Sequence, residues 1–384
     1  MKNSLIITFA ILLFSSCFLT KTIAQKKEGL KDALKPDFFI GTALSVNQVA
    51  GKDPRALAVV RKHFDAIVPE NCMKSMFLQP EQGHFFFDDA DRFVAFGERN
   101  HLWMTGHCLV WHSQTPAWLF VDKNGKDVSR DTLIARMRNH IMTVVGRYKG
   151  RIKGWDVVNE AFNDDGTYRK SKWYEIIGED FIPLAFKFAH EADPNAQLYY
   201  NDYGLANAAK RNAVVKLVQS LKAQGLRIDA VGEQGHNGMN YPDLRELEKS
   251  IEAFAATGVK VMITELDLTV LPTPTHTETA DVSTNFEYQK SLNPYPDGLP
   301  EAIDSAWTQR YLEMFKIFLR HKDVISRVTL WGISDADTWR NDWPIKGRTD
   351  YPLLFDRQYN AKPVVAEIIK AANEMNKKNG KNKS

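Results

Sequence analysis

The chain has 384 residues, of which 44% are hydrophobic and 25% are charged, and these values exclude a disordered or membrane-spanning protein. Its 50 Lys and Arg against 47 Asp and Glu leave a net charge of +3, which does not indicate a basic surface for nucleic acid. The length allows two or three domains, or one large α/β barrel.

Residues 1–24 have the pattern of a signal peptide. Lys2 gives a positive start, Leu5–Phe14 is an apolar run, and Thr22–Ala24 offers a small-residue cleavage site. The apolar run is too short to span a bilayer, and no later segment is long enough either. We therefore expect an exported protein, secreted or periplasmic, without a membrane span. The residues before Cys17 loosely resemble a bacterial lipoprotein signal, so a lipid anchor at Cys17 is the minority alternative.

Short apolar runs alternate with longer amphipathic stretches along the rest of the chain. The runs are rich in Val, Ile, Leu, Tyr and Trp, as is typical of buried parallel strands. The predicted strands are Phe38–Ala43, Ala66–Pro69, Leu102–Val110, Ile152–Asn159, Gln197–Asn201, Ala230–Gly232, Lys260–Thr264 and Arg327–Ile333. The predicted helices include Leu133–Tyr148, Ala208–Gln224, Leu244–Ala256 and Trp307–Leu319.

This alternation predicts a parallel sheet, and the number of units favours a single closed (β/α)8 TIM barrel over residues 25–372. An open doubly wound sheet is the alternative, but no glycine-rich dinucleotide turn follows the first predicted strand. The long stretch Leu271–Ser305 is expected to be a loop. It either contributes to function or makes no contact with ligand, and the sequence favours neither. Residues 373–384 are rich in Lys and Asn and are expected to form a basic, disordered tail.

Cys72 and Cys108 are the two cysteines that remain after the signal. Two cysteines in a chain of this length do not make a disulfide scaffold, so we expect two buried thiols. A single bridge between them is the alternative for an oxidising compartment.

Polar residues gather where the predicted strands end, and the carboxyl ends of barrel strands are where barrel enzymes carry their chemistry. Seven such clusters on one face define a polar pit. Their members include Glu70, Asn71, Lys74, His107, Trp111, Gln114, Asn159, Glu160, Tyr203, Gln234, His236, Glu265, Asp267 and Trp331.

Two carboxylates stand out, because Glu160 and Glu265 end the fourth and seventh predicted strands on opposite sides of the barrel mouth. A pair of carboxyl groups, one protonated and one ionised, is the equipment of glycoside hydrolysis. Asn159 could hold a substrate hydroxyl, and His236 could pair with Asp267 beside Glu265. For either glutamate alone, a solvated residue at the barrel rim or a partner in a salt bridge would be the better interpretation.

Other chemistries are less well supported. His107, His112 and His236 share the barrel mouth, but no His-x-His or His-Glu-x-x-His spacing occurs, so we expect no catalytic metal. No Gly-x-Ser-x-Gly elbow and no glycine-rich phosphate loop is present. We therefore expect no cofactor.

The strand-end segments resemble the family 10 glycoside hydrolases, the endo-β-1,4-xylanases. The resemblance covers residues 41–356, and its most specific segments are Trp155–Ala161 and Thr264–Asp267. It implies a (β/α)8 barrel that cleaves the xylan backbone internally with retention of configuration. Glu160 matches the acid/base of the family and Glu265 its nucleophile, and retention implies carboxyl groups about 5–5.5 Å apart.

Further roles follow from the same resemblance. It implies that Glu70, Asn71 and Lys74 bind the sugar on the non-reducing side, with His107, Trp111 and Gln114 beside them. Asn159 and Gln234 would contact hydroxyls of the scissile unit, and His236, supported by Asp267, would orient Glu265. Trp331 and Trp339 would wall the cleft, and Tyr203 would face the bond that is cut. For Trp155 and Trp173 we expect core packing instead.

The partners implied are xylan and xylo-oligosaccharides, bound by a monomer. A non-catalytic xylan-binding protein is the first alternative, which the presence of both Glu160 and Glu265 argues against. A cellulase is the second, and it would differ by having room for a hydroxymethyl group.

Overall fold

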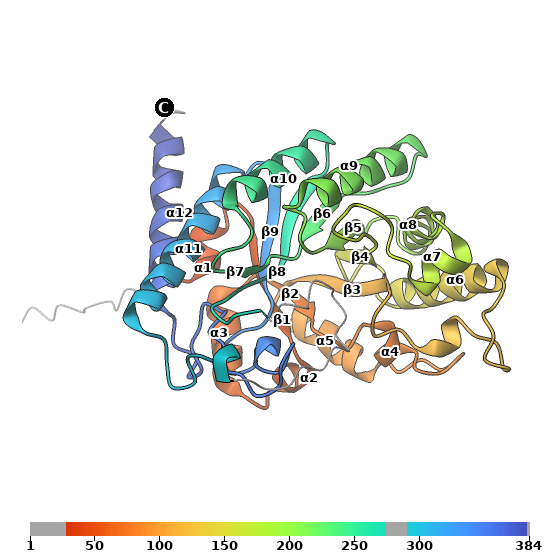
Figure 1. Cartoon of the computed structure of the whole chain (residues 1–384), viewed down its shortest axis with the longest axis horizontal. Helices are drawn as coiled ribbons and strands as arrows, with labels where there is room; N and C mark the ends of the chain where they lie inside the picture. The colour runs from red at the N-terminus through yellow and green to blue at the C-terminus, as the bar shows by residue number, and fades with distance from the viewer. Residues whose placement is uncertain (1–27, 274–289, 382–384) are drawn as a thin grey trace, which may run out of the picture.

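The structure is a computed structural model that describes residues 28–273 and 290–381. Its centre is a closed barrel of parallel strands in the order β6-β5-β4-β3-β2-β1-β9-β8, in which β6 also pairs with β8 (Figure 1). The strands are β1 (Phe39–Leu44), β2 (Ala66–Pro69), β3 (Trp103–Trp111), β4 (Gly154–Asn159), β5 (Gln197–Asp202), β6 (Ala230–Glu233), β7 (His236–Gly238), β8 (Lys260–Thr269) and β9 (Ile325–Leu330). The predicted (β/α)8 barrel is therefore confirmed.

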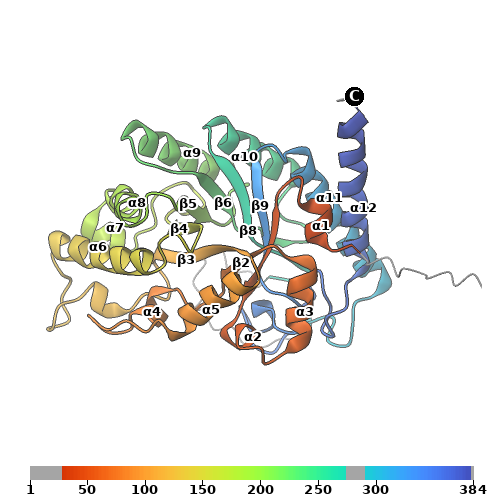
Figure 2. The same ribbon diagram turned by 180° about the vertical axis from the view of Figure 1, so that it is seen from behind.

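Helices surround the barrel on its outside, as the two opposite views show (Figures 1 and 2). The α-helices are α1 (Leu30–Leu34), α2 (Val46–Val49), α3 (Pro54–His63), α4 (Ser75–Leu78), α5 (Asp88–Arg99), α6 (Arg130–Arg147), α7 (Lys172–Ile177), α8 (Phe181–Ala192), α9 (Ala208–Ala223), α10 (Leu244–Ala256), α11 (Glu301–Arg320) and α12 (Pro363–Lys381). Short 3-10 turns lie at η1 (Ala117–Leu119), η2 (Lys290–Leu292) and η3 (Trp339–Asn341).

The seventh predicted strand, which is β8 in the structure, is longer than predicted. β8 runs to Thr269 because the three-residue strand β7 pairs with its second half, where His236 lies opposite Asp267. Sequence patterning missed β7 because it is short and polar. As a result, Glu265 and Asp267 lie within a paired strand rather than on a loose loop.

Two predictions about loops and ends need correction. Helix α11 begins at Glu301, so the loop predicted for Leu271–Ser305 ends earlier, and its part from 274 to 289 lies outside the described residues. Helix α12 continues to Lys381, so most of the predicted tail is helical rather than disordered. Its asparagines make structural contacts: Asn373 donates to Glu28 (2.9 Å) and Asn376 donates to Asp37 (3.0 Å). The predicted signal, residues 1–24, lies wholly outside the described residues.

The interior is packed closely enough to require one particular glycine. A Cβ on Gly106 of β3 would lie 2.1 Å from the ring of Trp155, so only glycine fits at this position. Trp155 and Trp173 are both buried, and the indole of Trp173 donates to the carbonyl of Trp111 (2.9 Å). The prediction that these two tryptophans serve the core is confirmed.

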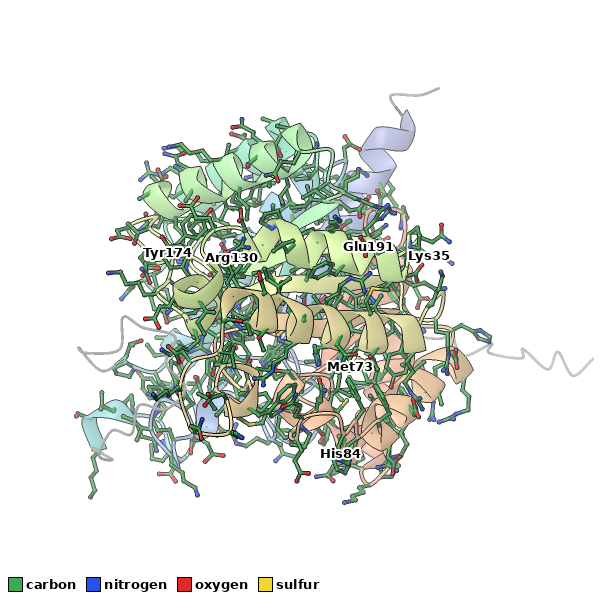
Figure 3. The ribbon with its side chains drawn as sticks, turned by 90° about the vertical axis from the view of Figure 1, so that its right-hand side faces the viewer. Lys35, Met73, His84, Arg130, Tyr174 and Glu191 are labelled. Atoms are coloured by element: carbon green, nitrogen blue, oxygen red, sulfur yellow. The ribbon has the colours of Figure 1, made fainter. Side chains whose placement is uncertain are left out.

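Many side chains that project from the outer helices end in nitrogen or oxygen atoms, among them Arg130 and Glu191 (Figure 3). Arg138 of α6 pairs with Glu191 of α8 (2.9 Å), and Arg130 pairs with Asp180 (2.6 Å). Such exposed pairs contribute little to stability. They are consistent with an outer surface that meets water.

The two cysteines are buried and free, as expected for structural thiols. Burial raises the pKa of Cys72 to about 12, which keeps the thiol protonated. Within residues 28–273 and 290–381, no helix combines the length and the apolar character needed to cross a bilayer.

Candidate active site

A cleft of about 860 Å³ opens at the carboxyl ends of the barrel strands. Every catalytic and substrate-binding residue predicted from the sequence lines it, although these residues are spread over most of the chain. They are Glu70, Asn71, Lys74, His107, Trp111, Gln114, Asn159, Glu160, Tyr203, Gln234, His236, Glu265, Trp331 and Trp339. Asp267 does not line the cleft and lies behind it, completely buried.

Glu160 follows directly after β4 and points into the cleft. Its Oε2 accepts a hydrogen bond from the indole of Trp111 (2.9 Å), and its Oε1 accepts one from the amide of Gln234 (2.8 Å). Nδ1 of His112 lies 3.9 Å from Oε2. The backbone of Glu160 has a φ of 56°, a left-handed conformation that is uncommon for residues other than glycine. Such strain often occurs at functional sites.

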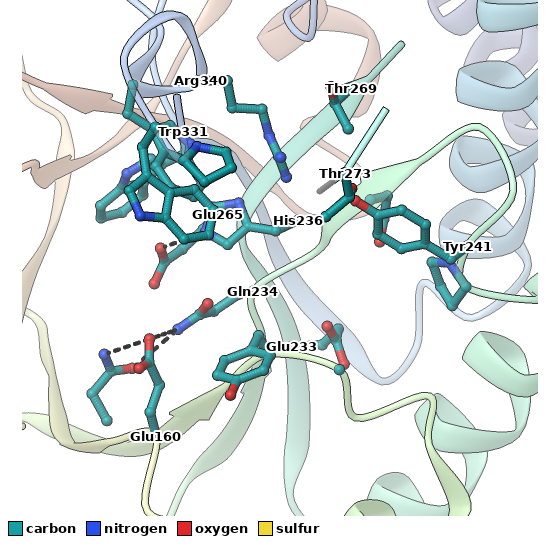
Figure 4. A pocket seen from close by; sticks show the side chains of 18 of the residues that line it. Glu160, Glu233, Gln234, His236, Tyr241, Glu265, Thr269, Thr273, Trp331 and Arg340 are labelled. Carbon is teal, nitrogen blue, oxygen red and sulfur yellow. Dashed lines mark hydrogen bonds and ion pairs between the residues drawn. The ribbon is translucent and has the colours of Figure 1, made fainter. Parts of the chain in front are cut away.

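Glu265 lies in β8 and points into the same pocket from the opposite side (Figure 4). Its Oε1 accepts a hydrogen bond from the amide of Asn201 (2.9 Å), and its Oε2 lies 3.2 Å from Nε2 of His236. Burial would raise the pKa of Glu265. The hydrogen bond with His236 and the charges of His107, His236 and Lys74 outweigh burial, so the pKa of Glu265 lies below its usual value. Glu265 is therefore the ionised carboxylate of the cleft.

His236 connects Glu265 to a buried anion, as the sequence predicted. Its Nδ1 lies 3.0 Å from Oδ2 of Asp267. The same oxygen accepts a hydrogen bond from Trp339 (2.8 Å), and Oδ1 of Asp267 accepts one from Arg340 (2.8 Å). Burial disfavours a cationic imidazole, but Asp267 and Glu265 outweigh it and raise the pKa of His236 to about 9. Burial likewise opposes the Asp267 anion, but Arg340 and His236 lower its pKa to about 2. A charged imidazole thus lies beside Glu265 at neutral pH.

The stability of the protein is expected to fall with rising pH through this histidine. Because the pKa of His236 is raised from 6.5 to about 9, the folded protein holds this proton more tightly than the unfolded chain does. Protonation of His236 therefore contributes on the order of 3 kcal/mol to the free energy of unfolding. This contribution is fully present below about pH 6.5 and is lost as the pH rises through about 9. Denaturant unfolding of wild type and His236→Gln at about pH 6 and about pH 9.5 measures it.

The free energy of unfolding of His236→Gln should change less between the two pH values than that of wild type. His84→Gln is the matched control, because His84 is exposed, and it should keep the wild-type dependence. An unchanged pH dependence in His236→Gln would show that His236 is not the titrating group.

One side of the cleft is lined by residues of the segment that follows β2 and by residues of β3. Nζ of Lys74 donates to Asn71 (2.9 Å) and lies 5.0 Å from the centre of the Trp111 ring. Burial lowers the pKa of Lys74, and the nearby carboxylates partly offset this effect. Nδ1 of His107 is fixed by a 2.9 Å contact with the buried Asp156. These groups form a buried polar wall that can recognise sugar hydroxyls.

Aromatic rings form the rest of the wall. Trp331 lies against His107 with ring centres 5.3 Å apart, and Trp339 lies against His236 with ring centres 4.9 Å apart. Trp343 extends this surface by stacking on Trp339 at 4.8 Å. Flat apolar faces beside hydrogen-bonding groups suit a sugar ring.

The sequence interpretation missed several residues of the site. Asn201 holds Glu265, Arg340 neutralises Asp267, and Glu233, Tyr241 and Trp343 line the cleft. Asn201 ends the fifth predicted strand, Glu233 directly precedes Gln234, and Arg340 follows Trp339, so position alone could have suggested them. Their contacts could not be read from sequence. Burial raises the pKa of Glu233 to about 7.

The arrangement suits acid–base and nucleophilic chemistry. In the described part of the chain, no group of three His, Cys, Asp or Glu side chains is placed to hold a metal ion. What the cleft offers is an ionised carboxylate in Glu265 and a second carboxyl group in Glu160 across the pocket (Figure 4). Two carboxyl groups on either side of a sugar-sized cleft can cleave a glycosidic bond.

Comparison with known proteins agrees with this geometry. The model of the family "Glycosyl hydrolase family 10" matches residues 29–371. Endo-1,4-beta-xylanase A of Xylanibacter ruminicola is 54% identical over 348 residues, which cover 91% of this chain and 94% of the relative. An endo-1,4-beta-xylanase of Geobacillus stearothermophilus is 41% identical over 342 residues, which cover 88% of this chain and 97% of the relative. Among solved structures, a GH10 endoxylanase from a sugarcane soil metagenome has a TM-score of 0.86 at 48% identity, covering 89% of this chain and 99% of that one.

Proposed function

Since the chain belongs to glycosyl hydrolase family 10, we propose that this glycoside hydrolase is an endo-1,4-β-xylanase that cleaves internal bonds of xylan with retention of configuration. The observation that carries the proposal is the pairing of Glu160 and Glu265 in one cleft whose walls are aromatic rings and buried hydrogen-bonding groups. Xylo-oligosaccharides are the expected products and smaller substrates.

In the first step, a carboxylate oxygen of Glu265 attacks the anomeric carbon and forms an ester bond to the sugar. The glycosidic C–O bond breaks, and Glu160 gives its proton to the departing oxygen. Asn201 and His236 hold Glu265 by both oxygens, so the attacking group is fixed in orientation before the substrate arrives.

In the second step, water attacks the anomeric carbon from the side that the leaving sugar vacated. Glu160 takes a proton from this water, and the ester bond to Glu265 breaks, which restores both groups. Formation of the ester removes the negative charge of Glu265, and this favours the ionised form of Glu160 that acts as base. Two inversions at one carbon give net retention.

The remaining cleft residues would bind the sugar chain. Glu70, Asn71 and Lys74 would hold the unit on the non-reducing side, and Asn159 and Gln234 would contact hydroxyls at the scissile unit. The residues that would form the surrounding walls are His107, Trp111, Gln114, Tyr203, Trp331 and Trp339.

A reducing-sugar assay on xylan and on carboxymethyl-cellulose tests the proposal. We expect the wild type to release sugar from xylan at least about 10-fold faster than from carboxymethyl-cellulose. The reason is that the extra hydroxymethyl group of glucose must find room in a packed cleft. Equal or faster release from carboxymethyl-cellulose would instead indicate a cellulase. Binding to xylan without release of sugar would indicate a non-catalytic binding protein.

We also propose that the protein is exported and acts as a monomer. Lys2 and the apolar run Leu5–Phe14 support removal of residues 1–24 as a signal, and a lipid anchor at Cys17 is the alternative. A polysaccharide substrate supports this location, because the polymer lies outside the cell.

A further inference from the structure

Lys210 of α9 is a fully buried lysine that does not line the cleft. Its Nζ lies 2.9 Å from Oδ1 of Asp202, 3.4 Å from Asp164 and 3.6 Å from the centre of the Tyr203 ring. Burial disfavours the ammonium, but Asp202, Tyr203 and Asp164 outweigh it and raise the pKa of Lys210. Lys210 is therefore a buried cation, and a buried charge is costly unless its contacts compensate for it.

The contacts of Lys210 lead to the backbone of Glu160. Glu160 is held in its left-handed conformation by hydrogen bonds to three backbone groups, which belong to the two peptide units on either side of its Cα. Its N–H donates to the carbonyl of Asn201 (2.9 Å), and its carbonyl accepts from Nε of Arg169 (3.1 Å). The next N–H, that of Ala161, donates to the hydroxyl of Tyr200 (3.0 Å). Two of these three partners are the side chains of Tyr200 and Arg169. The two hydrogen bonds that they make therefore depend on the contacts that keep these side chains in position.

Lys210 holds both of those partners through one intermediate each. The hydroxyl of Tyr200 donates to Oδ2 of Asp202 (2.6 Å), whose other oxygen contacts Lys210. Arg169 donates to the hydroxyl of Tyr203 (2.9 Å), whose ring covers the Lys210 ammonium. One cation thus fixes two separate connections to the same strained residue.

We propose that Lys210 is a positioning residue that places the carboxyl group of Glu160 for proton transfer, through Asp202 and Tyr200 on one side and Tyr203 and Arg169 on the other. The proposal rests on the function proposed above, in which Glu160 is the acid and base. Lys210 itself touches no substrate. Its removal should therefore impair the steps that need a proton from Glu160 more than the steps that do not.

Leaving groups of different acidity separate these steps. Departure of dinitrophenolate from a dinitrophenyl xylobioside needs no proton, whereas departure of phenolate from a phenyl xylobioside does. We expect Lys210→Met to lower kcat/KM for the phenyl substrate by about 10- to 100-fold, because a small misplacement of a catalytic group has effects of this size. The value for the dinitrophenyl substrate should remain close to that of wild type.

Lys216→Met is the matched control, because Lys216 lies on the same helix with its side chain exposed. It should leave both substrates unaffected. A second pair of variants covers the case in which Lys210→Met does not fold: Arg169→Met should show the same selective loss, and the neighbouring exposed Lys170→Met should not.

A loss of equal size on both substrates, or no loss on either, would overturn the positioning role. That result differs from a failure of the proposed function. If the protein is not a xylanase, the wild type itself will release neither phenol.

Discussion

Replacing Glu265 by alanine is expected to lower kcat/KM on xylan by on the order of 10⁵-fold, the scale of losing a catalytic nucleophile. The variant has no group in place to form the glycosyl ester, and Asn201 and His236 are left without the oxygens they hold. The reducing-sugar assay on purified protein measures the loss. A mechanism-based fluoro-xylobioside should attach covalently to wild type at Glu265, which mass spectrometry of the digested protein can locate.

Glu252→Ala provides the control for Glu265→Ala, since Glu252 is an exposed glutamate on α10. It should keep full activity and should be labelled by the fluoro sugar as wild type is. A Glu265→Ala protein that retained a substantial fraction of activity, or a label on a different carboxylate, would contradict the role of Glu265.

Glu160→Ala is expected to lower kcat/KM on xylan by about 10³-fold, within the usual range for a general acid. Xylan has a poor leaving group that must receive a proton as it departs. A dinitrophenyl xylobioside has a good one, so it should still form the ester with Glu265. The ester should then accumulate, because no base remains to activate water, and a rapid burst of dinitrophenolate followed by slow turnover should be observed.

Azide should restore turnover of Glu160→Ala, because it is a nucleophile that needs no base and can enter the space vacated by the side chain. The product should be a xylobiosyl azide of β configuration, which nuclear magnetic resonance can identify. Glu175→Ala, an exposed glutamate on α7, should show neither the burst nor the rescue. Absence of rescue in Glu160→Ala would count against the acid–base role, and an α-azide would count against retention.

Much of the fold could be predicted because parallel strands are buried on both faces and appear as apolar runs. The site followed from the same pattern, because the polar residue after each run must lie at the same end of the barrel. Glu160 and Glu265 could therefore be placed together without knowledge of any contact. The short strand β7 could not be predicted, since His236–Gly238 has neither the length nor the apolar character of the other strands.

The contacts that tune the site were beyond prediction because they join residues far apart in the chain. Arg340 reaches Asp267 across 73 residues, and Asn201 reaches Glu265 across 64. Lys210 is a further example, because a lysine near the start of an amphipathic helix would ordinarily be expected in solvent. The correction at α12 has a similar origin: the composition of residues 373–381 is that of a tail, and only the contacts with Glu28 and Asp37 show otherwise.

The pairing of β1 with β9 has a consequence for the order in which the molecule can be made. Thr42 donates to the carbonyl of Gly332 across 290 residues, and Phe39 lies opposite Arg327 in the register of the two strands. Until β9 has been synthesised, the growing chain has two open sheet edges, at β1 and β8, and open edges invite pairing with other chains. Closure of the barrel must therefore await the last strand, so the complete cleft forms only after most of the polypeptide has left the ribosome.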